Sequence, residues 1–529
     1  MLSIKGDLSY RILKNYSRLE SKWYKPEIVF NADESGWPGD WEGRTILALV
    51  LLAQATGREP AYLDRILVLL KGQLNEKGYL KRIYPSGLFD EQQFSGHNWL
   101  LRGLLEYYIW KKDESVREMI LKIIYNLYLP AKDYYQFYPT DPKDRSYDGK
   151  MAGELTGSIV GHWYTSSDIG CAYMCFDALS QAYKLFRTPE MGDMLEKMFQ
   201  YFTIIDFKNT GMQTHATLTA ARGILRLYRN RRDKRYLDFV TELFQLYREE
   251  AMTENYANYN WFGRPLWTEP CAIVDSYILA AELYFLTKES FYMEIANKIY
   301  YNAIGYAQRL NGGFGCDTCA GPENLIITPN GLPFGEAYWC CTMRGAEGLS
   351  AVRNYSVVRE KDILRILHHH QMHYRDAMID LYEEPKYPEE GEIFLCGTAV
   401  EDQTLILYMP TWANIQLVDG VPYSHEQNEM WIFLNKGDFH ITITFCVPLI
   451  KQKPIGKNTR KDVYSLWHGD LMLGIRTADI INLNDRDVTR KKGSCYLITG
   501  TEYELNRIDG NIDLEYTELD KLSTQVLFH

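Results

Sequence analysis

The sequence lacks any run of about twenty apolar residues, the length that a membrane-spanning helix needs. The N-terminal segment, Met1-Leu-Ser-Ile-Lys-Gly-Asp7, also lacks the apolar core of a signal peptide. We therefore expect no membrane partner and a cytoplasmic location. A leader removed before Met1 would leave no trace, so this expectation concerns only the chain as given.

An excess of basic residues is also absent, because the net charge is −11 and the pI is about 5.6. Nucleic-acid binding requires a concentrated basic surface. The one basic cluster, at 226–235, holds six Arg or Lys residues and is typical of a solvated connection between two helices. The charge pattern therefore excludes nucleic acid as a partner.

Cysteine is sparse, with ten residues in 529 at irregular spacing. This pattern fits a reducing compartment better than a disulfide framework, so the thiols are available to a metal. Aromatic residues are abundant by contrast, with 40 Tyr, 21 Phe and 12 Trp. Sugar rings stack on such side chains, which favours a carbohydrate ligand, although most of them will fill the core. Nothing in the sequence separates a monomer from a homodimer, and both stay open.

Strand patterns are scarce before residue 365, where apolar residues instead recur at helical spacing. This periodicity predicts helical hairpins and a final helix that begins at Cys340. The expected hairpins are 43–56 with 60–73, 96–110 with 114–125, 168–186 with 190–202, 215–228 with 234–248, and 271–286 with 291–308. About six hairpins predict an (α/α)6 barrel over residues 1–364, with a pocket formed by the loops at one end.

Beyond residue 365 the chain changes to short alternating runs, such as 403–408, 430–434 and 440–446, separated by turn residues. This pattern predicts an antiparallel β-sandwich over residues 365–529. The run His368-His-His370 could suggest a metal site. Because successive side chains of a strand point to opposite faces, we interpret the run as structural.

Two short segments offer four metal ligands: Trp267-Thr-Glu-Pro-Cys271 and Tyr338-Trp-Cys-Cys341. Glu269, Cys271, Cys340 and Cys341 supply one carboxylate and three thiols, a donor set that zinc accepts. Adjacent cysteines need an irregular backbone to converge on one ion, which is typical of working sites. In the alternative, Cys340 and Cys341 are small buried apolar residues.

A further segment, Cys316-Asp-Thr-Cys319, leaves another arrangement open. Cys316 and Cys319 could form a four-thiolate zinc site with Cys340 and Cys341. Glu269 and Cys271 would then have no metal, and the protein would be a zinc-stapled scaffold.

The same segments resemble the motifs of glycoside hydrolase family 127, the β-L-arabinofuranosidases and their relatives. Residues 267–272 resemble that family's Glu-x-Cys-Ala motif, and 340–348 resemble its double-cysteine motif. Weaker similarities follow in the same order along the chain, at 73–79, 96–97, 214–216 and 467–470. The resemblance implies a retaining exo-glycosidase in which the zinc-bound Cys340 attacks the anomeric carbon.

The acid/base residue is where the sequence departs from the family pattern. The resemblance places a Gly-Glu-Ala-Phe segment shortly before the Glu-x-Cys motif, but this chain has Thr253-Glu-Asn-Tyr256 there. We assign the role to Glu254, which keeps the order of glutamate and aromatic residue. Gly335-Glu-Ala-Tyr338 is closer by letters, yet it directly precedes the cysteines, so Glu336 is the weaker candidate.

By the same resemblance, His97 and His215 would bind sugar hydroxyls, since each lies near a predicted helix start. Two other functions compete with the glycosidase. One is a non-catalytic carbohydrate-binding protein that keeps the metal. The other is an epimerase or lyase on the same barrel, which would use His and Tyr bases rather than clustered thiols.

Overall fold

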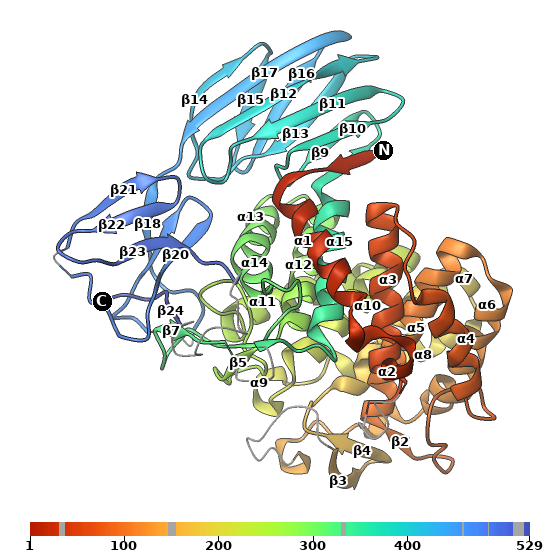
Figure 1. The fold of residues 1–529 in the computed structure, drawn as a ribbon. Helices are drawn as coiled ribbons and strands as arrows, with labels where there is room; N and C mark the ends of the chain where they lie inside the picture. The colour runs from red at the N-terminus through yellow and green to blue at the C-terminus, as the bar shows by residue number, and fades with distance from the viewer. Residues whose placement is uncertain (31–36, 146–154, 330–334, 458–459, 485, 511–522) are drawn as a thin grey trace.

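The computed structural model describes residues 1–529 except 31–36, 146–154, 330–334, 458–459, 485 and 511–522. A helical barrel occupies the N-terminal two thirds of the chain, and two β regions lie beside it (Figure 1). The helices are α1 (Gly6–Leu19), α2 (Pro26–Val29), α3 (Asp40–Thr56), α4 (Leu63–Gln73), α5 (Glu91–Lys111), α6 (Glu114–Ile123), α7 (Cys175–Phe186), α8 (Pro189–Phe202), α9 (Phe207–Thr210), α10 (Thr214–Arg231), α11 (Lys234–Glu250), α12 (Pro270–Thr287), α13 (Phe291–Ile299), α14 (Gly305–Ala307) and α15 (Cys341–Ser356).

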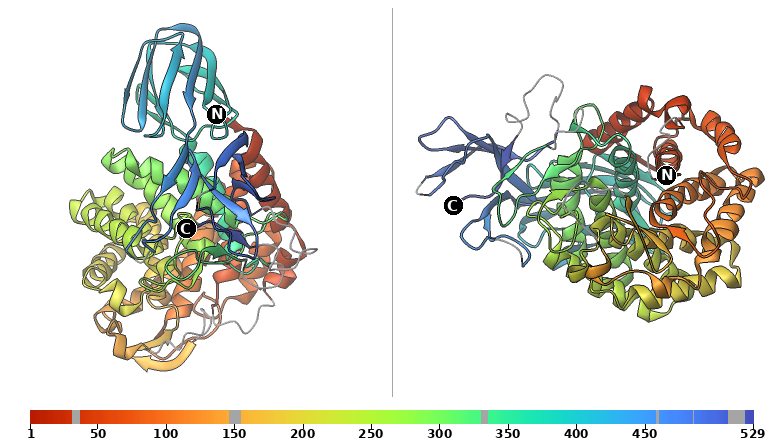
Figure 2. Two further views of the ribbon diagram at one scale, coloured as in Figure 1. Left: turned by 90° about the vertical axis from the view of Figure 1, so that its left-hand side faces the viewer. Right: turned by 90° about the horizontal axis from the view of Figure 1, so that it is seen from below.

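Six of these helices form a closed inner ring. Each of α3, α5, α7, α10, α12 and α15 contacts the next, and α15 returns to α3. The view from below shows the helices arranged around this ring (Figure 2). The outer partners α4, α6, α8, α11 and α13 follow their inner helices, which confirms the five predicted hairpins. The predicted (α/α)6 barrel is therefore present.

The sixth hairpin is discontinuous, which the sequence analysis did not foresee. α15 has no outer helix after it and packs instead against α1 from the start of the chain. Because α1 and α15 are far apart in sequence, periodicity alone cannot pair them. The N-terminus therefore closes the barrel.

Four of the hairpin turns share the same local backbone conformation. Four inner helices end on a non-glycine residue with positive φ, whose backbone N–H bonds to the helix: Lys112, Arg187, Arg232 and Lys288. The side chain of Asp113 or Asp233 then caps the next outer helix by accepting a backbone N–H. Each turn is thus short, and all inner helices begin at the same end of the barrel.

α12 is apolar enough that length and composition alone would let it cross a membrane, but 78% of that window is buried inside the protein. An inner helix contacts neighbours on all sides, so it loses the one-sided pattern of a surface helix. This explains the composition of α12 without a membrane.

The β part begins earlier than expected. The last barrel helix ends at Ser356, and β8 (Val357–Glu360) starts at once. A four-residue strand carries too little alternation to be recognised in the sequence. The other strands of this sandwich are β9 (Ile363–Ile366), β10 (Met372–Arg375), β11 (Ile379–Pro385), β12 (Glu392–Ala399), β13 (Gln403–Tyr408), β14 (Asn414–Asp419), β15 (Tyr423–Glu426), β16 (Glu429–Leu434) and β17 (Gly437–Cys446).

The sandwich consists of two sheets. One has the order β1-β10-β11-β12-β17-β14, in which β1 (Leu2–Ile4) is contributed by the N-terminus, and the other has the order β15-β16-β13-β9-β8. β1 pairs with β10 in an antiparallel register that places Ser3 opposite His373. The start of the chain therefore ties the sandwich to the barrel.

A second β region follows, where the sequence analysis expected one continuous sandwich. Its strands follow the order β18-β19-β20-β23-β22-β21, with β24 beside β20 and β7 from the barrel beside β24. The bounds are β18 (Leu449–Gln452), β19 (Ser465–His468), β20 (Leu471–Arg476), β21 (Val488–Lys492), β22 (Cys495–Ile498), β23 (Glu504–Arg507), β24 (Thr524–Gln525) and β7 (Ile326–Ile327). It lies on the left of Figure 1, apart from the sandwich. Strand alternation alone cannot show where one sheet ends and another begins.

Two glycines let inner helices approach closely. A Cβ at Gly43 on α3 would lie 2.0 Å from the backbone nitrogen of Leu100 on α5. A Cβ at Gly223 on α10 would lie 2.3 Å from the backbone of Phe176 on α7. Both distances are below van der Waals contact, so the ring diameter depends on these positions.

We expect Gly43→Ala to destabilise the protein by about 1–3 kcal/mol or more, because the methyl group would collide with backbone rather than with a flexible side chain. Urea unfolding would measure the change. The matched control is Gly72→Ala on α4, where a Cβ has no neighbour within 4 Å. This substitution should stabilise the helix by about 0.5–1 kcal/mol. Equal effects at both positions would contradict the role of Gly43.

Candidate active site

The four predicted ligands come together at the N-termini of two adjacent inner helices. Glu269 is the residue immediately before α12, with Pro270 at its first position and Cys271 following. Cys340 immediately precedes α15, which Cys341 begins. Helix N-termini carry partial positive charge, which favours carboxylates and thiolates. All four ligand atoms lie within 4.8 Å of one another.

The donor geometry fits a tetrahedral metal ion. The Sγ atoms of Cys340 and Cys341 are 3.3 Å apart, and those of Cys271 and Cys341 are 3.6 Å apart. Metal–sulfur bonds of about 2.3 Å require sulfur atoms roughly 3.8 Å apart at the corners of a tetrahedron. The spacing and the donor set of three thiols and one carboxylate therefore suit a thiophilic divalent cation. We call this group, Glu269, Cys271, Cys340 and Cys341, the thiol cluster.

The ligands of the thiol cluster differ in exposure and acidity. Cys340 is half-buried, whereas the other three are buried. Hydrogen bonds with Cys271 and then Cys341 lower the pKa of Cys340. Burial raises the pKa values of Cys271 and Cys341, and burial also raises that of Glu269. Cys340 is thus the member that becomes an anion most readily.

Arg44 on α3 supplies a fixed positive charge beside the thiol cluster. Its Nη1 donates to Cys271 Sγ at 3.4 Å, and its Nε contacts both carboxylate oxygens of Asp40 at 2.9 Å. The guanidinium also lies 4.2 Å from the ring centre of Trp99. Arg44 is 5% exposed, and these contacts hold its side chain in one orientation. Nothing in the sequence analysis identified Arg44.

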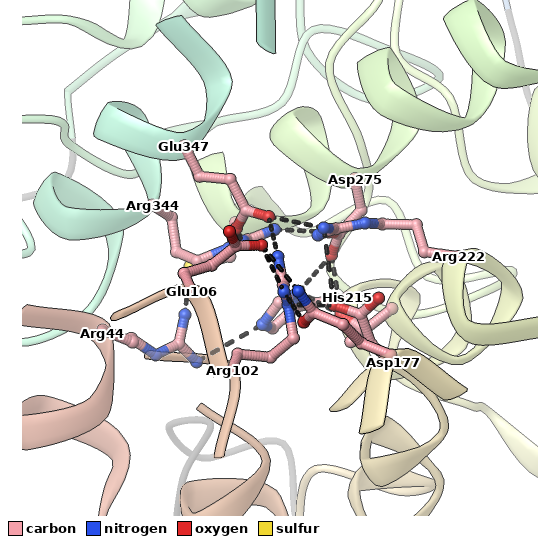
Figure 3. Close-up of polar contacts among 12 residues, drawn as sticks. Arg44, Arg102, Glu106, Asp177, His215, Arg222, Asp275, Arg344 and Glu347 are labelled. Carbon is pink, nitrogen blue, oxygen red and sulfur yellow. Dashed lines mark hydrogen bonds and ion pairs between the residues drawn. The ribbon is translucent and has the colours of Figure 1, made fainter. Parts of the chain in front are cut away.

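His215 joins Arg44 to a buried charge network. Its Nδ1 lies 2.8 Å from Asp275 Oδ2, and its Nε2 lies 3.4 Å from Arg44 Nη2 (Figure 3). Arginine can only donate, so Nε2 accepts and Nδ1–H donates to Asp275. Burial lowers the pKa of His215, which agrees with this neutral tautomer. His215 is therefore positioned under the thiol cluster by two partners.

The rest of the network lies in the barrel centre (Figure 3). Asp275 accepts from Arg222 at 2.5 Å and from Arg344, and Glu347 accepts from Arg222 at 2.5 Å and from Arg102 at 3.3 Å. The arginine charges hold the pKa of Asp275 well below its usual range. Arg344 and Glu347 belong to the double-cysteine segment. Two opposite charges three residues apart in a helix predicted to face the barrel interior were the signal that could have identified them.

His97 is placed differently from His215. It is fully buried, its Nε2 accepts the Leu80 N–H at 2.9 Å, and its Nδ1 lies 2.8 Å from the Gln93 carbonyl oxygen. Burial lowers the pKa of His97 to about 4. Both ring nitrogens are thus engaged by backbone, an arrangement that supports the fold. Contact of His97 with a sugar remains a prediction that this geometry does not favour.

Glu254 lies in the buried loop after α11. Its Oε2 accepts the Ile455 N–H at 2.9 Å, while its buried Oε1 has no hydrogen-bond partner. Burial raises the pKa of Glu254 to about 8. The carboxyl group is therefore protonated at neutral pH, the state that a general acid requires.

Glu336 is engaged by three side chains in structural contacts. Arg18 Nη2 contacts its Oε2 at 2.7 Å, Asn311 donates to Oε2 at 2.9 Å, and Thr342 donates to Oε1 at 2.7 Å. These bonds tie α1 to the segment before α15. All three partners engage Glu336 in the packing of α1 against α15, while the role of Glu254 as the acid/base stays a prediction.

The alternative four-thiolate site is not assembled. Cys316 Sγ lies 4.0 Å from Cys341 Sγ, but Cys319 Sγ lies 3.7 Å from the Asn258 carbonyl oxygen. Within the described residues, Glu269, Cys271, Cys340 and Cys341 are the group of His, Cys, Asp and Glu residues that could hold a metal. Cys316 therefore borders the thiol cluster, and Cys319 points elsewhere.

Two buried amides were also missed: Gln213 beside the thiol cluster, and Asn260, whose backbone carbonyl oxygen accepts the Thr214 N–H at 2.9 Å. Gln213 Nε2 lies 3.5 Å from Glu269 Oε2. The Oε1 of Gln213 and both side-chain polar atoms of Asn260 are buried without a partner. Buried polar atoms are rarely unpaired, so these two amides are candidates for contact with a ligand. Their positions in loops gave no periodic signal.

In chelator-treated protein, we expect iodoacetate to modify Cys340 first among the cluster thiols, because it is the least buried and its pKa is lowered. Its modification should reach half of its limiting rate below about pH 8.5, the pKa of a free cysteine. Mass spectrometry of peptides would measure each rate, with the exposed Cys446 as a control for the reagent. Faster modification of Cys341 than of Cys340 would contradict this order.

Comparisons with known proteins extend over the whole chain. No family model matches the sequence, and no curated protein is similar to it in sequence. A structure described as a GH127 β-arabinofuranosidase is similar with a TM-score of 0.68 and 14% identity, covering 100% of this chain and 96% of the other. A GH127 β-L-arabinofuranosidase from Geobacillus stearothermophilus T6 is similar with a TM-score of 0.67 and 12% identity, covering 100% of both chains. A third structure, described as a glycoside hydrolase, has a TM-score of 0.66 at 13% identity and covers 100% of this chain and 96% of the other. From end to end, the chain shares the fold of the GH127 β-arabinofuranosidases, an α/α barrel followed by β domains.

Proposed function

We propose that the protein is a retaining exo-glycosidase that releases a terminal L-arabinofuranose or a related sugar from glycans. The observation that carries this proposal is the thiol cluster, in which Cys340 alone is not buried. The shared fold with β-arabinofuranosidases supports the substrate class. The nucleophile would be Cys340, and the acid/base would be Glu254.

Zinc is the cation that we propose for the thiol cluster. Bound by Glu269, Cys271, Cys340 and Cys341, it would keep Cys340 as a thiolate at neutral pH. The residues around the cluster would make Cys271 and Cys340 differ in nucleophilic character. Arg44 donates to Cys271 Sγ, and this draws electron density from that sulfur. Among the described residues, no arginine donates a hydrogen bond to Cys340 Sγ, so this sulfur keeps more nucleophilic character.

In the first half-reaction, Cys340 Sγ attacks the anomeric carbon and the bond to the leaving oxygen breaks. Glu254 gives its proton to that oxygen, which takes the electron pair. In the second half-reaction, the Glu254 carboxylate takes a proton from water. The water oxygen attacks the anomeric carbon, and the carbon–sulfur pair returns to Cys340. Two inversions give overall retention.

Gln213, Asn260 and His215 would bind and orient the sugar near Cys340. The unpaired amide atoms of Gln213 and Asn260 can each accept or donate to a hydroxyl group. His215 is held by Asp275 and Arg44, so a contact with the sugar would require it to share these bonds. The main effect of His215 would then be to hold Arg44 beside Cys271.

We expect one zinc ion per chain in protein purified without chelator, measured by elemental mass spectrometry. Cys271→Ser should lower the zinc content, because a hydroxyl group is a weaker zinc ligand than a thiolate. Cys319→Ser is the matched control and should retain zinc, since Cys319 Sγ faces Asn258. Absence of zinc from the unaltered protein, or equal loss in the two variants, would contradict the proposed metal site.

We expect Glu254→Ala to lose activity on natural glycosides by about 10²–10⁴-fold, the usual contribution of an acid/base residue. An activated aryl glycoside leaves without a proton, so this variant should still load one sugar onto Cys340 and then stall. Intact-protein mass spectrometry would detect the loaded enzyme. Azide should relieve the stall and give a product of retained configuration.

Glu336→Ala is the matched control for Glu254→Ala, because Glu336 is engaged by Arg18. This variant should be less stable than the unaltered protein, and azide should not restore activity to it. In the unaltered enzyme, kcat/KM should fall as pH rises through about 8, where Glu254 loses its proton. Rescue in the Glu336 variant would reassign the acid. Binding of sugar with no turnover in either unaltered or variant protein would indicate the non-catalytic carbohydrate-binding function.

A further inference from the structure

A fifth cysteine lies beside the thiol cluster and has no part in the proposed function. The Sγ atom of Cys316 lies 4.0 Å from that of Cys341. Two sulfur ligands of one tetrahedral ion are separated by roughly 3.8 Å, so this spacing suits a shared metal. Cys316 is nevertheless outside the four residues whose ligand atoms lie within 4.8 Å of one another. The thiol cluster is therefore complete without Cys316.

The backbone holds Cys316 beside Glu269. β5 (Trp267–Thr268) pairs with β6 (Asp317–Thr318) in an antiparallel register that, continued by one residue, places Cys316 opposite Glu269. The backbone of Glu269 is still extended, with φ −122° and ψ 116°. Directly opposed residues of an antiparallel pair point to the same face, with Cβ atoms about 4.5–5.5 Å apart. The side chain of Cys316 is therefore a neighbour of the carboxylate ligand.

The segment around Cys316 is also tied to the start of α15, which carries the other thiols. The Phe314 N–H donates to Thr342 Oγ1 at 3.0 Å. On the other side, Arg309 Nη2 donates to the Cys316 carbonyl oxygen at 3.4 Å. These bonds fix the backbone of the segment between the two parts of the chain that supply the thiol cluster.

The Cys316 side chain can turn while its backbone stays in place. A cysteine has one side-chain torsion, so a change between staggered rotamers re-aims the sulfur alone. Among the described residues, the contact printed by the geometry of this thiol is the one with Cys341 Sγ, and the residue is 5% exposed. A buried thiol with one soft contact has little to lose by turning toward a metal ion.

The proposed reaction would leave the metal short of one ligand. When Cys340 Sγ bonds to the anomeric carbon, its sulfur changes from a thiolate to a thioether. A thioether carries no negative charge and is a poor substitute for the thiolate that zinc prefers. Three ligands, Glu269, Cys271 and Cys341, would then hold the ion. Another thiolate would restore both the ligand number and the ligand charge.

We propose that Cys316 is a reserve ligand, which replaces Cys340 at the metal while Cys340 carries the sugar. Both ligand sets share Glu269, Cys271 and Cys341. Cys316 and Cys340 are therefore alternatives for the fourth position. The Cys316 thiol gives its proton to water when it binds the metal, and it regains a proton when the Cys340 thiolate returns. Cys316 acts through the metal and is a positioning residue, and its role rests on the zinc site of the proposed function.

The test is X-ray absorption of zinc-loaded protein, which counts the sulfur neighbours of the metal. We expect three sulfur neighbours in the unaltered protein, in Cys316→Ser and in Cys340→Ala. The double variant Cys340→Ala/Cys316→Ser should have two. Titration against a competing chelator should give dissociation constants within about tenfold of the unaltered value for each single variant. The double variant should bind roughly a hundredfold more weakly, because each of four ligands carries about a quarter of the binding free energy.

The double variant Cys340→Ala/Cys319→Ser is the matched control. Cys319 Sγ lies 3.7 Å from the Asn258 carbonyl oxygen, so this variant should keep the three sulfur neighbours and the zinc affinity of Cys340→Ala. The set of variants also separates an exchanging ligand from a structural thiol. A structural thiol would weaken zinc binding by the same factor with and without Cys340, whereas a reserve ligand matters only when Cys340 is missing.

A second measurement does not depend on the folding of a double variant. Alkylation of Cys340 by iodoacetamide in metal-free protein makes a thioether at the sulfur that would carry the sugar. The alkylated unaltered protein should rebind zinc with an affinity within about tenfold of the untreated protein, and alkylated Cys316→Ser should bind roughly a hundredfold more weakly. Peptide mass spectrometry would verify that Cys340 is modified to the same extent in both.

Three results would overturn this proposal alone. One is two sulfur neighbours in Cys340→Ala with three in the unaltered protein, and another is equal zinc affinity of Cys340→Ala and its Cys316→Ser double variant. The third is equal affinity of the two alkylated proteins. Absence of zinc from the unaltered protein would overturn the proposed metal site together with this proposal, so the two failures are distinguishable.

Discussion

The buried ion pair between Asp275 and Arg344 sets the geometry on which the candidate site depends. Asp275 lies four residues after Cys271 on α12, and Arg344 lies four residues after Cys340 on α15. Residues four apart share one face of a helix, so the ion pair lies one turn beneath the two thiols and keeps them facing each other. His215 and Arg222 of α10 bind the same carboxylate, which joins three inner helices. Removing one partner of such a network would leave a buried charge uncompensated, at a cost of about 3–5 kcal/mol.

The arginines beside the thiol cluster offset the negative charge of its ligands. Three thiolates and one carboxylate exceed the charge of a divalent cation by two, and a dry site would not tolerate that excess alone. Arg44 and Arg344 both lie over the Trp99 ring, at 4.2 and 4.3 Å from its centre, and Arg44 contacts Cys271 directly. The guanidinium groups thus offset part of the charge of the ligands, and the charge of Arg44 acts on Cys340 as well as on Cys271. Cys340 is the half-buried member of the cluster, and under the proposed function it is the thiol that meets the substrate.

The arrangement of the chain also explains why two β regions accompany the barrel. β1 joins the sandwich while α1 closes the ring against α15, so the first twenty residues link both parts. The second β region supplies Ile455, whose backbone N–H fixes Glu254 in its buried position. Loss of the second β region would therefore remove a contact of the proposed acid/base.

The sequence by itself determined the helical barrel, the change to strands and the thiol cluster, because helical period and ligand type are local properties. It could not pair α1 with α15, divide the β part into two regions, or identify Arg44 and Asp275, since these depend on contacts between distant segments. It also could not separate His215 from His97, because both were predicted near helix starts, whereas in the structure His215 is the second residue of α10 and His97 lies in the second turn of α5. Only the tertiary structure decided whether a ring nitrogen meets backbone or a carboxylate. The same reason applies to the histidine run, where the ring nitrogens of His368 and His369 meet partners from other segments, whereas the buried His370 Nε2 has none.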